Sequence, residues 1–422
     1  MRILFVSAFY PPHVIGGWEQ LVQDINISMQ ERGHETAILT STHGAGADQL
    51  RGDGTGVRRV LHLESDLNHY RPQAFWGYRR RVRQNIEETR RAIADFQPDV
   101  VFVHIMWNLT RGIPWVAEQL CPGRVVYYVA DHWPYLPTTH EQYWLGSTRN
   151  PVTTYMKRAV APVPMHFVRQ DQRAFSLQFR HVLCVSEAIR QALAANTPIA
   201  RDNLHVVHNG IDTRAFAPQT PSVATRYQPP LRLLYAGSLV PHKGVITAVE
   251  ALGVLQRDGD LHSEMLTIVG SGRSDYEAYL RQRAGELGIG DAVIFRGRVP
   301  RTEMPQLFHA HDVLIFPSMW EEPLARVTQE AMAAQLVVAG TLTGGTGELL
   351  IDGETGLAFP PGDAGALADC IRRLRSDAAL CRRLALAGSE RVKRYFDIER
   401  MIDELEAYLQ QVCTISSERV TG

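Results

Sequence analysis

The sequence has few features of a secreted, membrane-spanning or nucleic-acid-binding protein. Its five cysteines are an odd number, and no two have the CxxC spacing, which fits a reducing compartment better than secretion. The formal net charge of the 422 residues is −1, so the chain has no overall field to attract nucleic acid. No run of eighteen apolar residues occurs, and no signal-peptide pattern precedes the strand-like residues that follow Met1. We therefore expect a cytoplasmic protein with no nucleic-acid partner.

Motifs for metals and nucleoside triphosphates are also missing. No Asp-x-Asp pair follows a predicted strand, no His and Cys residues have zinc spacing, and no Walker loop occurs. Asp352 and Asp363 lie in segments rich in Gly and Pro, which turns explain. We expect no bound metal and no resident cofactor.

Apolar runs of strand length alternate with amphipathic segments of helix length. Strands are predicted at 3–6, 36–39, 100–103, 125–129, 182–185 and 204–207, and again at 231–235, 265–269, 293–295, 313–316 and 337–339. Helices are predicted at 18–30, 78–96 and 398–412. Continuous Val, Ile and Leu runs are typical of parallel strands that are buried on both faces. The fold class predicted is α/β, with two Rossmann-like parallel-sheet domains.

The domain boundaries follow from a segment rich in proline. Residues 215–230 contain four prolines and show no periodicity, which is typical of a linker. We predict a first domain over 1–214, a second over 231–395 and a terminal helix within 396–422. Ligands of parallel sheets bind beyond the carboxyl ends of the strands, so we expect the substrates in a cleft between the two domains.

Two glutamates, Glu322 and Glu330, follow the predicted strand 313–316 and are eight residues apart. If a helix begins near Pro323, its first turn offers free N–H groups and a positive dipole end to a diphosphate. The two carboxylates would then accept hydrogen bonds from sugar and ribose hydroxyls. Spacing alone does not decide this, because two glutamates on one helix are usually solvated.

Further motifs surround these glutamates in a definite order. The second half contains Pro317-Ser-Met-Trp-Glu-Glu-Pro323, Glu330-Ala-Met-Ala333, Gly344-Gly-Thr-Gly-Glu348, Asp352-Gly-Glu-Thr-Gly356 and Pro360-Pro-Gly-Asp363. The first half contains Gly16-Gly-Trp-Glu19, Val185-Ser-Glu187 and His208-Asn-Gly-Ile-Asp212, and Ala236-Gly-Ser-Leu-Val-Pro-His-Lys-Gly244 follows the linker. Together they resemble the family-4 glycosyltransferases of the GT-B fold, over about residues 1–410.

The resemblance implies a retaining glycosyltransferase whose last helix crosses back to the first domain. The expected donor is a nucleoside-diphosphate hexose, with UDP- and GDP-sugars as first candidates. The expected acceptor is a glycan, a lipid-linked compound or a small molecule. The leaving diphosphate would take the acceptor proton during attack on the same face of the sugar, without a metal.

The resemblance also implies roles for single residues. Lys243 resembles a lysine that contacts the diphosphate, Glu330 one that accepts the ribose hydroxyls, and Glu322 one that binds the donor sugar. His104 resembles a histidine beside the anomeric carbon, so the implied catalytic set is His104, Lys243 and Glu322. The rest of the implied donor site is Gly16, Gly17, Ser238, Leu324, Ala325, Arg326 and Val327. The implied acceptor site is Glu19, His104, Asp131 and Trp133.

Some positions depart from the family pattern. Ser238 stands where the family commonly has Arg, and we expect Arg326 to supply the missing positive charge. Leu324-Ala325 replaces the usual Phe-Gly, which changes the donor-sugar pocket. Ala130, before Asp131, replaces a frequent histidine.

Two alternatives and one surface stay open at this point. A nucleotide-sugar epimerase of GT-B fold and a non-catalytic sugar-binding subunit share much of this pattern. The basic run Arg79-Arg-Arg-Val-Arg83 fits a solvated helix face, and it also fits a peripheral contact with anionic lipid at the inner face of a membrane.

Overall fold

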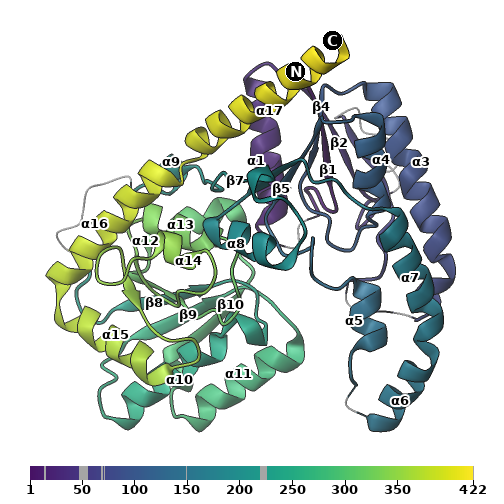
Figure 1. The fold of residues 1–422 in the computed structure, drawn as a ribbon. Helices are drawn as coiled ribbons and strands as arrows, with labels where there is room; N and C mark the ends of the chain where they lie inside the picture. The colour runs from purple at the N-terminus through teal and green to yellow at the C-terminus, as the bar shows by residue number, and fades with distance from the viewer. Residues whose placement is uncertain are drawn as a thin grey trace. The chain divides into compact units, whose positions relative to one another are not determined.

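The computed structural model describes residues 1–13, 16–46, 56–67, 70, 72–148, 150–218 and 226–421. These residues form two compact units. Unit 1 comprises Met1–Val185, Ile189–Val207 and Ile402–Gly422, and unit 2 comprises Ser186–Ala188 and His208–Met401. Each unit is built on one parallel β-sheet with helices packed around it (Figure 1). The predicted α/β class with two Rossmann-like domains is confirmed.

The sheet of unit 1 has the order β3-β2-β1-β4-β5-β6-β7, and every pairing is parallel. Its strands are β1 (Arg2–Ser7), β2 (Glu35–Ser41), β3 (Val57–Leu61), β4 (Val100–Val103), β5 (Val125–Val129), β6 (His181–Cys184) and β7 (Leu204–Val206). The strand order reverses between β1 and β4. The carboxyl ends of these two strands form the topological switch point, where ligands of such sheets bind.

Helices cover both faces of this sheet. The helices of this unit are α1 (Trp18–Glu31), η1 (Pro72–Gly77), α3 (Tyr78–Phe96), α4 (Gly112–Leu120), α5 (Thr139–Leu145), α6 (Pro151–Val160), α7 (Pro162–Ala174), α8 (Glu187–Asn196) and η2 (Arg201–Asn203). Figure 1 shows α1 on one side of β1, β2 and β4, with α3 and α4 on the other. Helix α3 has the predicted bounds, because Tyr78, Val82 and Ile93 form a buried stripe and Gln97 ends the helix with φ of 49°.

The last helix, α17 (Ile398–Thr421), joins unit 1 from Ile402 onward. Its buried side chains Ile402, Leu405, Leu409 and Val412 recur every three or four residues, which is the spacing of one helix face. Arg32 Nη1 lies 2.7 Å from Glu406 Oε2, and His34 Nε2 lies 2.8 Å from Glu406 Oε1. These contacts attach α17 to the chain between α1 and β2.

The sheet of unit 2 has the order β10-β9-β8-β11-β12-β13 and is also parallel throughout. Its strands are β8 (Arg232–Ala236), β9 (Met265–Val269), β10 (Val293–Gly297), β11 (Val313–Phe316), β12 (Val337–Gly340) and β13 (Leu357–Ala358). Here the order reverses between β8 and β11, which places the switch point of unit 2 at their carboxyl ends.

The helices of unit 2 form two groups. They are α9 (Thr213–Phe216), η3 (Pro241–Lys243), α10 (Val245–Arg257), α11 (Ser274–Glu286), η4 (Gly290–Ala292), η5 (Arg301–Glu303), α12 (Met304–His309), α13 (Arg326–Ala333), α14 (Thr346–Leu349), α15 (Ala364–Ser376) and α16 (Ala378–Tyr395). Helix α10 packs against α11 and α15, whereas α13 packs against α9 and α16. In Figure 1 the strands β8, β9 and β10 lie between α13 and the pair α10 and α11.

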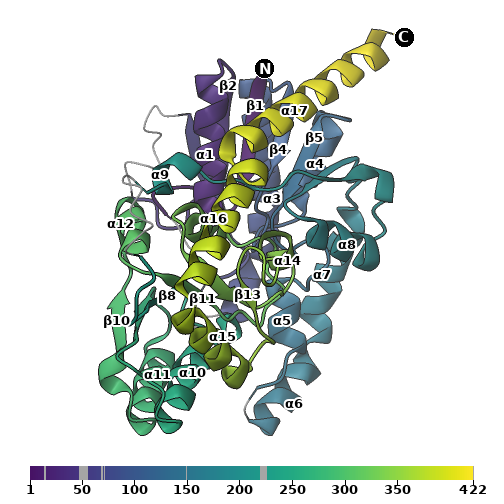
Figure 2. The same ribbon diagram turned by 90° about the vertical axis from the view of Figure 1, so that its left-hand side faces the viewer.

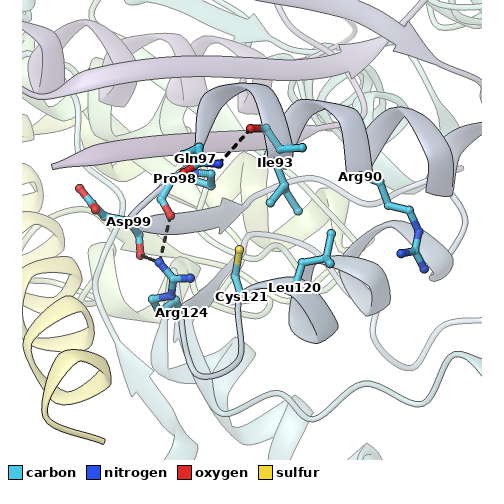
Figure 3. A pocket seen from close by; sticks show the side chains of 9 residues that line it. Arg90, Ile93, Gln97, Pro98, Asp99, Leu120, Cys121 and Arg124 are labelled. Atoms are coloured by element: carbon cyan, nitrogen blue, oxygen red, sulfur yellow. Dashed lines mark hydrogen bonds between the residues drawn. The ribbon is translucent and has the colours of Figure 1, made fainter. Parts of the chain in front are cut away.

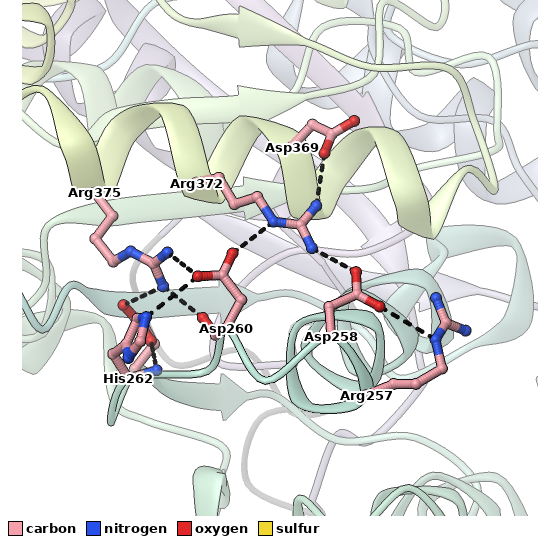
Figure 4. A network of polar contacts seen from close by, with 8 residues as sticks. Arg257, Asp258, Asp260, His262, Asp369, Arg372 and Arg375 are labelled. Atoms are coloured by element: carbon pink, nitrogen blue, oxygen red, sulfur yellow. Dashed lines mark hydrogen bonds and ion pairs between the residues drawn. The ribbon is translucent and has the colours of Figure 1, made fainter.

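An ion-pair network fixes α15 to the connection between α10 and β9 (Figure 4). Arg372 contacts Asp258 and Asp260 at 2.6 Å each, and Arg375 Nη2 lies 2.5 Å from Asp260 Oδ1. The hydrogen bonds from Arg372 and Arg375 lower the pKa of Asp260 to about 2. The network lies away from the switch point, and we interpret it as structural.

The boundary between the units differs from the predicted one. Residues 208–214 belong to unit 2, although the prediction ended the first domain at 214. Ile211 N donates to Phe396 O at 3.0 Å, and Gln329 Nε2 donates to Asn209 O at 3.0 Å, so this segment packs against α13 and the start of α17. Residues 219–225 of the predicted linker lie outside the described residues. Within the described part of the chain, none of the helices has the length and apolar character that a membrane span needs.

Candidate active site

The carboxyl ends of β8 and β11 bring together two of the predicted site residues. Lys243 follows β8 in the short helix η3, and Glu322 follows β11 in the loop that leads to α13. Lys243 Nζ lies 2.6 Å from Glu322 Oε1 and 2.9 Å from Oε2. Glu322 is 5% exposed, whereas the side chain of Lys243 keeps 28% of its surface. The predicted sugar-binding carboxylate and diphosphate-binding amine therefore form an ion pair.

Ser318 also holds the carboxylate of Glu322. Its Oγ donates to Glu322 Oε1 at 2.5 Å, while Thr341 Oγ1, just after β12, donates to Ser318 O at 2.6 Å. Sequence reasoning gave Ser318 no role. The available signal was its place in the motif Pro317-Ser-Met-Trp, directly after β11. Ser318 leaves the carboxylate of Glu322 little freedom to turn.

Two glycines allow the loops around this pair to approach one another. At Gly244, where φ is 67°, a Cβ atom would lie 1.8 Å from Pro317 O. At Gly344, where φ is 55°, a Cβ atom would lie 2.2 Å from Glu322 O. Only glycine fits both the conformation and the space. Beside these loops lies a pocket of about 440 Å³, whose lining includes Glu321, Leu342, Gly344 and Phe359.

Helix α13 begins at Arg326, and the prediction of a start near Pro323 is wrong. A helix from Pro323 would use the carbonyl of Glu322 as its first acceptor, but that carbonyl accepts from Gly345 N at 2.7 Å. Ala325 occupies the N-cap position without a side-chain hydrogen bond, and the first turn has no acidic residue. Such an uncapped helix start offers N–H groups and a positive dipole end to an anion.

The other predicted donor residues lie around this helix start. Arg326 is 7% exposed and Leu324 is fully buried, while Val327 and Glu330 are half-buried. Ser238, at the end of β8, is exposed, and its carbonyl accepts from Tyr235 Oη at 2.9 Å. These positions all belong to one end of the sheet of unit 2.

Burial changes the titration of two side chains near the ion pair. It raises the pKa of Tyr235 well above its usual value, and the charge of Glu322 adds to the rise. Burial and then the charge of Lys243 lower the pKa of His242 below 6.5. Both groups are therefore neutral near pH 7.

In unit 1, His104 lies at the switch point. It follows β4, and its backbone N–H donates to Val6 O of the neighbouring strand β1 at 2.9 Å. The residue is 1% exposed, and its ring lies edge-on to Tyr128 at 5.3 Å between centroids. Asp131 follows β5, and burial raises its pKa to about 7.

The other predicted acceptor residues make local contacts. Gly16 N donates to Glu19 Oε2 at 3.0 Å, so the buried carboxylate of Glu19 lies at the start of α1, which Gly17 caps. The indole of Trp133 packs near Tyr127 and Phe179, at 6.3 and 5.7 Å between ring centroids. These contacts place Glu19 at the start of α1 and Trp133 against β5, and they assign neither residue any chemistry.

The described residues include no group of three or more His, Cys, Asp or Glu side chains arranged to hold a metal ion. A pocket of about 560 Å³ lies elsewhere in unit 1, between Asp99, which precedes β4, and Arg124, which precedes β5 (Figure 3). This is the amino end of the sheet. Since ligands of parallel sheets bind at the carboxyl ends, we assign this pocket no part in the reaction.

Two family models match the chain on either side of the linker. Residues 15–215 match glycosyltransferase family 4, and residues 219–391 match glycosyl transferases group 1. Both models describe glycosyltransferases, and together they cover most of the chain. The predicted family is thereby confirmed, and the enzyme class with it.

Curated relatives of this glycosyltransferase cover most of its length. It is 29% identical to a glycogen synthase of Mycobacterium tuberculosis over 414 residues, which is 94% of this chain and 91% of that protein. It is 28% identical to a D-inositol 3-phosphate glycosyltransferase of Streptomyces avermitilis over 278 residues, 63% of this chain and 58% of that protein.

Solved structures confirm the GT-B fold. Sucrose-phosphate synthase of Thermosynechococcus elongatus has a TM-score of 0.72 at 20% identity, covering 98% of this chain and 99% of that one. HepE of Anabaena, solved with UDP and glucose, has a TM-score of 0.69 at 20% identity, covering 97% and 100%. At this identity the similarity shows the fold alone.

Proposed function

We propose that this glycosyltransferase transfers a hexose-type sugar from a nucleoside-diphosphate sugar to a glycan, a lipid-linked compound or a small molecule, with retention of the anomeric configuration. The observation that carries the proposal is the pair of Lys243 and Glu322 at the switch point of unit 2, beside the uncapped start of α13. It combines a cation and helix N–H groups, which suit a diphosphate, with a fixed carboxylate, which suits sugar hydroxyls.

The ion pair supports a part for each partner in donor binding. An ammonium group has three N–H donors, and Lys243 directs two of them at Glu322. The third remains for a phosphate oxygen. Glu322 keeps its hydrogen bond from Ser318, so its carboxylate stays fixed while it accepts sugar hydroxyls. Glu330, one turn into α13, is the proposed acceptor for the ribose hydroxyls.

The proposed reaction proceeds on one face of the donor sugar. The acceptor oxygen forms a bond to the anomeric carbon as the bond from that carbon to the diphosphate oxygen breaks. The diphosphate leaves with the electron pair and takes the acceptor proton. Lys243, the N–H groups of α13 and Arg326 stabilise the developing negative charge, as a divalent metal would otherwise do. We propose His104, Asp131, Trp133 and Glu19 for the acceptor side.

A thermal-shift panel of UDP-, GDP-, ADP- and TDP-sugars tests the donor class. A ligand that binds only the native state raises the melting temperature, so one nucleotide is expected to stabilise the protein above the others. HepE of Anabaena binds UDP and UDP-glucose, which makes uridine nucleotides the first to measure. If no member of the panel shifts the melting temperature, the donor proposal is wrong.

Transfer assays with the stabilising donor test the reaction itself. NMR of the product is expected to show the anomeric configuration of the donor, and turnover is expected to survive excess EDTA. Loss of turnover on chelation, restored by Mg²⁺ or Mn²⁺, would contradict the metal-free account. A nucleotide-sugar that changes identity when incubated alone would indicate an epimerase. If the protein binds the donor but neither transfers the sugar nor slowly hydrolyses the donor, it is an accessory subunit.

A further inference from the structure

An exposed apolar surface lies on α6 and at the start of α7. Among the large hydrophobic side chains that the structure describes, six are more than half exposed. One is Trp76, at 91%. The others are Val152 at 65%, Tyr155 at 77%, Met156 at 64%, Val160 at 55% and Val163 at 63%. We call these five residues the α6 face.

Four residues of the α6 face form one side of the amphipathic helix α6. Residues 152, 155, 156 and 160 have the spacing i, i+3, i+4, i+8, which places them on a single stripe. The opposite side of α6 carries Lys157, which is buried and lies 4.9 Å from the ring centre of Tyr143. Helix α6 therefore has one packed side and one unpacked apolar side.

Helix α7 anchors this segment to the unit. Its residues Met165 and Val168 belong to a buried cluster with Tyr78 and Val82 of α3, and with Trp144 of α5. Both views of the ribbon show α6 beyond α5 and α7, at the end of the segment that is farthest from strands β1 and β4 (Figure 2). The α6 face thus projects from the body of unit 1.

The α6 face lies in a segment whose charged residues are all basic. Residues 150–170, which include α6 and most of α7, contain no Asp or Glu, but they contain Lys157, Arg158 and Arg169; Asp171, near the end of α7, is the next acidic residue. The basic segment of α3 adds to them, because Arg79 stacks over Phe167 of α7 at 4.4 Å. Arg79 also donates to Gln170 at 2.8 Å, which brings the start of α3 next to the outer side of α7.

We propose that the α6 face binds the surface of an anionic lipid bilayer. An amphipathic helix with an apolar face and flanking cations lies in the interface of such a membrane, with its apolar side chains among the acyl chains. Tyr155 has the amphipathic ring that membrane interfaces favour. The cations are attracted by anionic headgroups, whereas a protein partner or a second copy of this chain would need a matching acidic surface.

This inference does not depend on the donor or on the reaction, since vesicle binding is measured without turnover. Sedimentation of the full chain with vesicles of phosphatidylcholine mixed with phosphatidylglycerol is expected to give binding. Phosphatidylcholine alone is expected to bind at least about tenfold more weakly, because its headgroups carry no net charge to attract the cations near the α6 face. High salt is expected to reduce the difference.

A variant and a matched control locate the binding surface. The triple change Tyr155→Ser, Met156→Ser and Val160→Ser removes one aromatic and two aliphatic side chains from the α6 face, and it is expected to weaken vesicle binding about tenfold or more. The control Tyr279→Ser, Ile294→Ser and Leu386→Ser removes the same kinds of side chain from exposed positions in unit 2, where exposures are 45–48%. The control is expected to bind vesicles as the wild type does.

Three results would overturn the proposal. The first is wild-type binding to the mixed vesicles that matches binding to phosphatidylcholine alone. The second is an equal loss in the control variant. The third is a dimer in light scattering without vesicles that the α6-face variant converts to a monomer, because the occupant would then be a second copy of the chain. The melting temperature of both variants is expected to stay near that of the wild type, since the replaced side chains make few packing contacts.

Discussion

Replacing Lys243 by Met is expected to destabilise unit 2 more than replacing Glu322 by Gln. The two residues form one ion pair, but they are not equally buried: Glu322 is 5% exposed, and the side chain of Lys243 is 28% exposed. Loss of Lys243 leaves a buried carboxylate to which Ser318 Oγ still donates a hydrogen bond. Loss of the charge of Glu322 leaves an ammonium group that still reaches water.

The exposures set the size of the effect. Removing one partner of a buried pair typically costs about 3–5 kcal/mol. Because water reaches the Lys243 position and Ser318 still donates to the carboxylate, we expect about 2–3 kcal/mol for Lys243→Met. For Glu322→Gln we expect about 1 kcal/mol, because the amide oxygen can still accept from Ser318. For a domain of this size the first change should lower the melting temperature by about 5–10 °C.

The assay is unfolding by urea and by heat, without nucleotide, on the two single variants and the double variant. The double variant should resemble Glu322→Gln alone, because no charge is left buried without a partner. Lys393→Met is the control, since the same substitution on the exposed face of α16 should change the stability by less than about 0.5 kcal/mol.

Equal effects of the two single changes would refute this reasoning. So would a double variant whose loss is the sum of the single losses, because the side chains would then act independently. Either result would mean that the pair contributes little to the folded state, and that Lys243 is held in place by other contacts.

Three further predictions concern the proposed site and its surroundings. Glu330→Ala should weaken nucleoside-diphosphate binding in calorimetry, whereas Glu322→Ala should mainly lower kcat; affinity lost only in the Glu322 variant would reverse the two assignments. Arg326→Met should lower kcat/KM by an amount worth about 1.5–3 kcal/mol, as for a hydrogen bond to a charged group, and wild-type kinetics would remove Arg326 from the donor site. Burial raises the pKa of Glu348, but hydrogen bonds from His208 and from two N–H groups of α8 outweigh burial and lower it. Its stabilising effect should therefore be complete above about pH 5 and fade as the pH falls below about 4, so urea unfolding of Glu348→Gln and wild type should converge in acid.

The sequence predicted the strands that are buried on both faces. The runs at 100–103, 125–129, 265–269 and 313–316 have the same bounds in the structure, because a central parallel strand needs apolar side chains on both sides. Strand β3 was not predicted. It lies at the edge of the sheet and contains Arg58 and Arg59. Arg59 is buried, and its guanidinium donates to the carbonyls of Tyr10 and Pro11. Strand β13, with two residues, is too short for any periodicity.

The candidate site was predicted residue by residue, but its contacts were not. Lys243 and Glu322 are 79 residues apart in the sequence, and only the pairing of β8 with β11 brings the ends of their strands together. The start of α13 was misplaced for a similar reason. Pro323 is a favourable first residue of a helix, but Gly345, from another loop, takes the carbonyl that the helix would need. The helix preference of the residues around Pro323 cannot show that a glycine from another loop donates to the carbonyl of Glu322.

The position of α17 has a consequence for the order in which the protein matures. Unit 1 contains both the first strand of the chain and the last helix, and the buried side chains Ile402, Leu405 and Leu409 belong to it. A nascent chain that has emerged only as far as β7 therefore lacks a part of its own first unit. Until the last helix is synthesised, the surface that α17 covers stays open to solvent or to a chaperone. Emergence of residues 402–412, rather than the synthesis of β7, is then the event that lets unit 1 close.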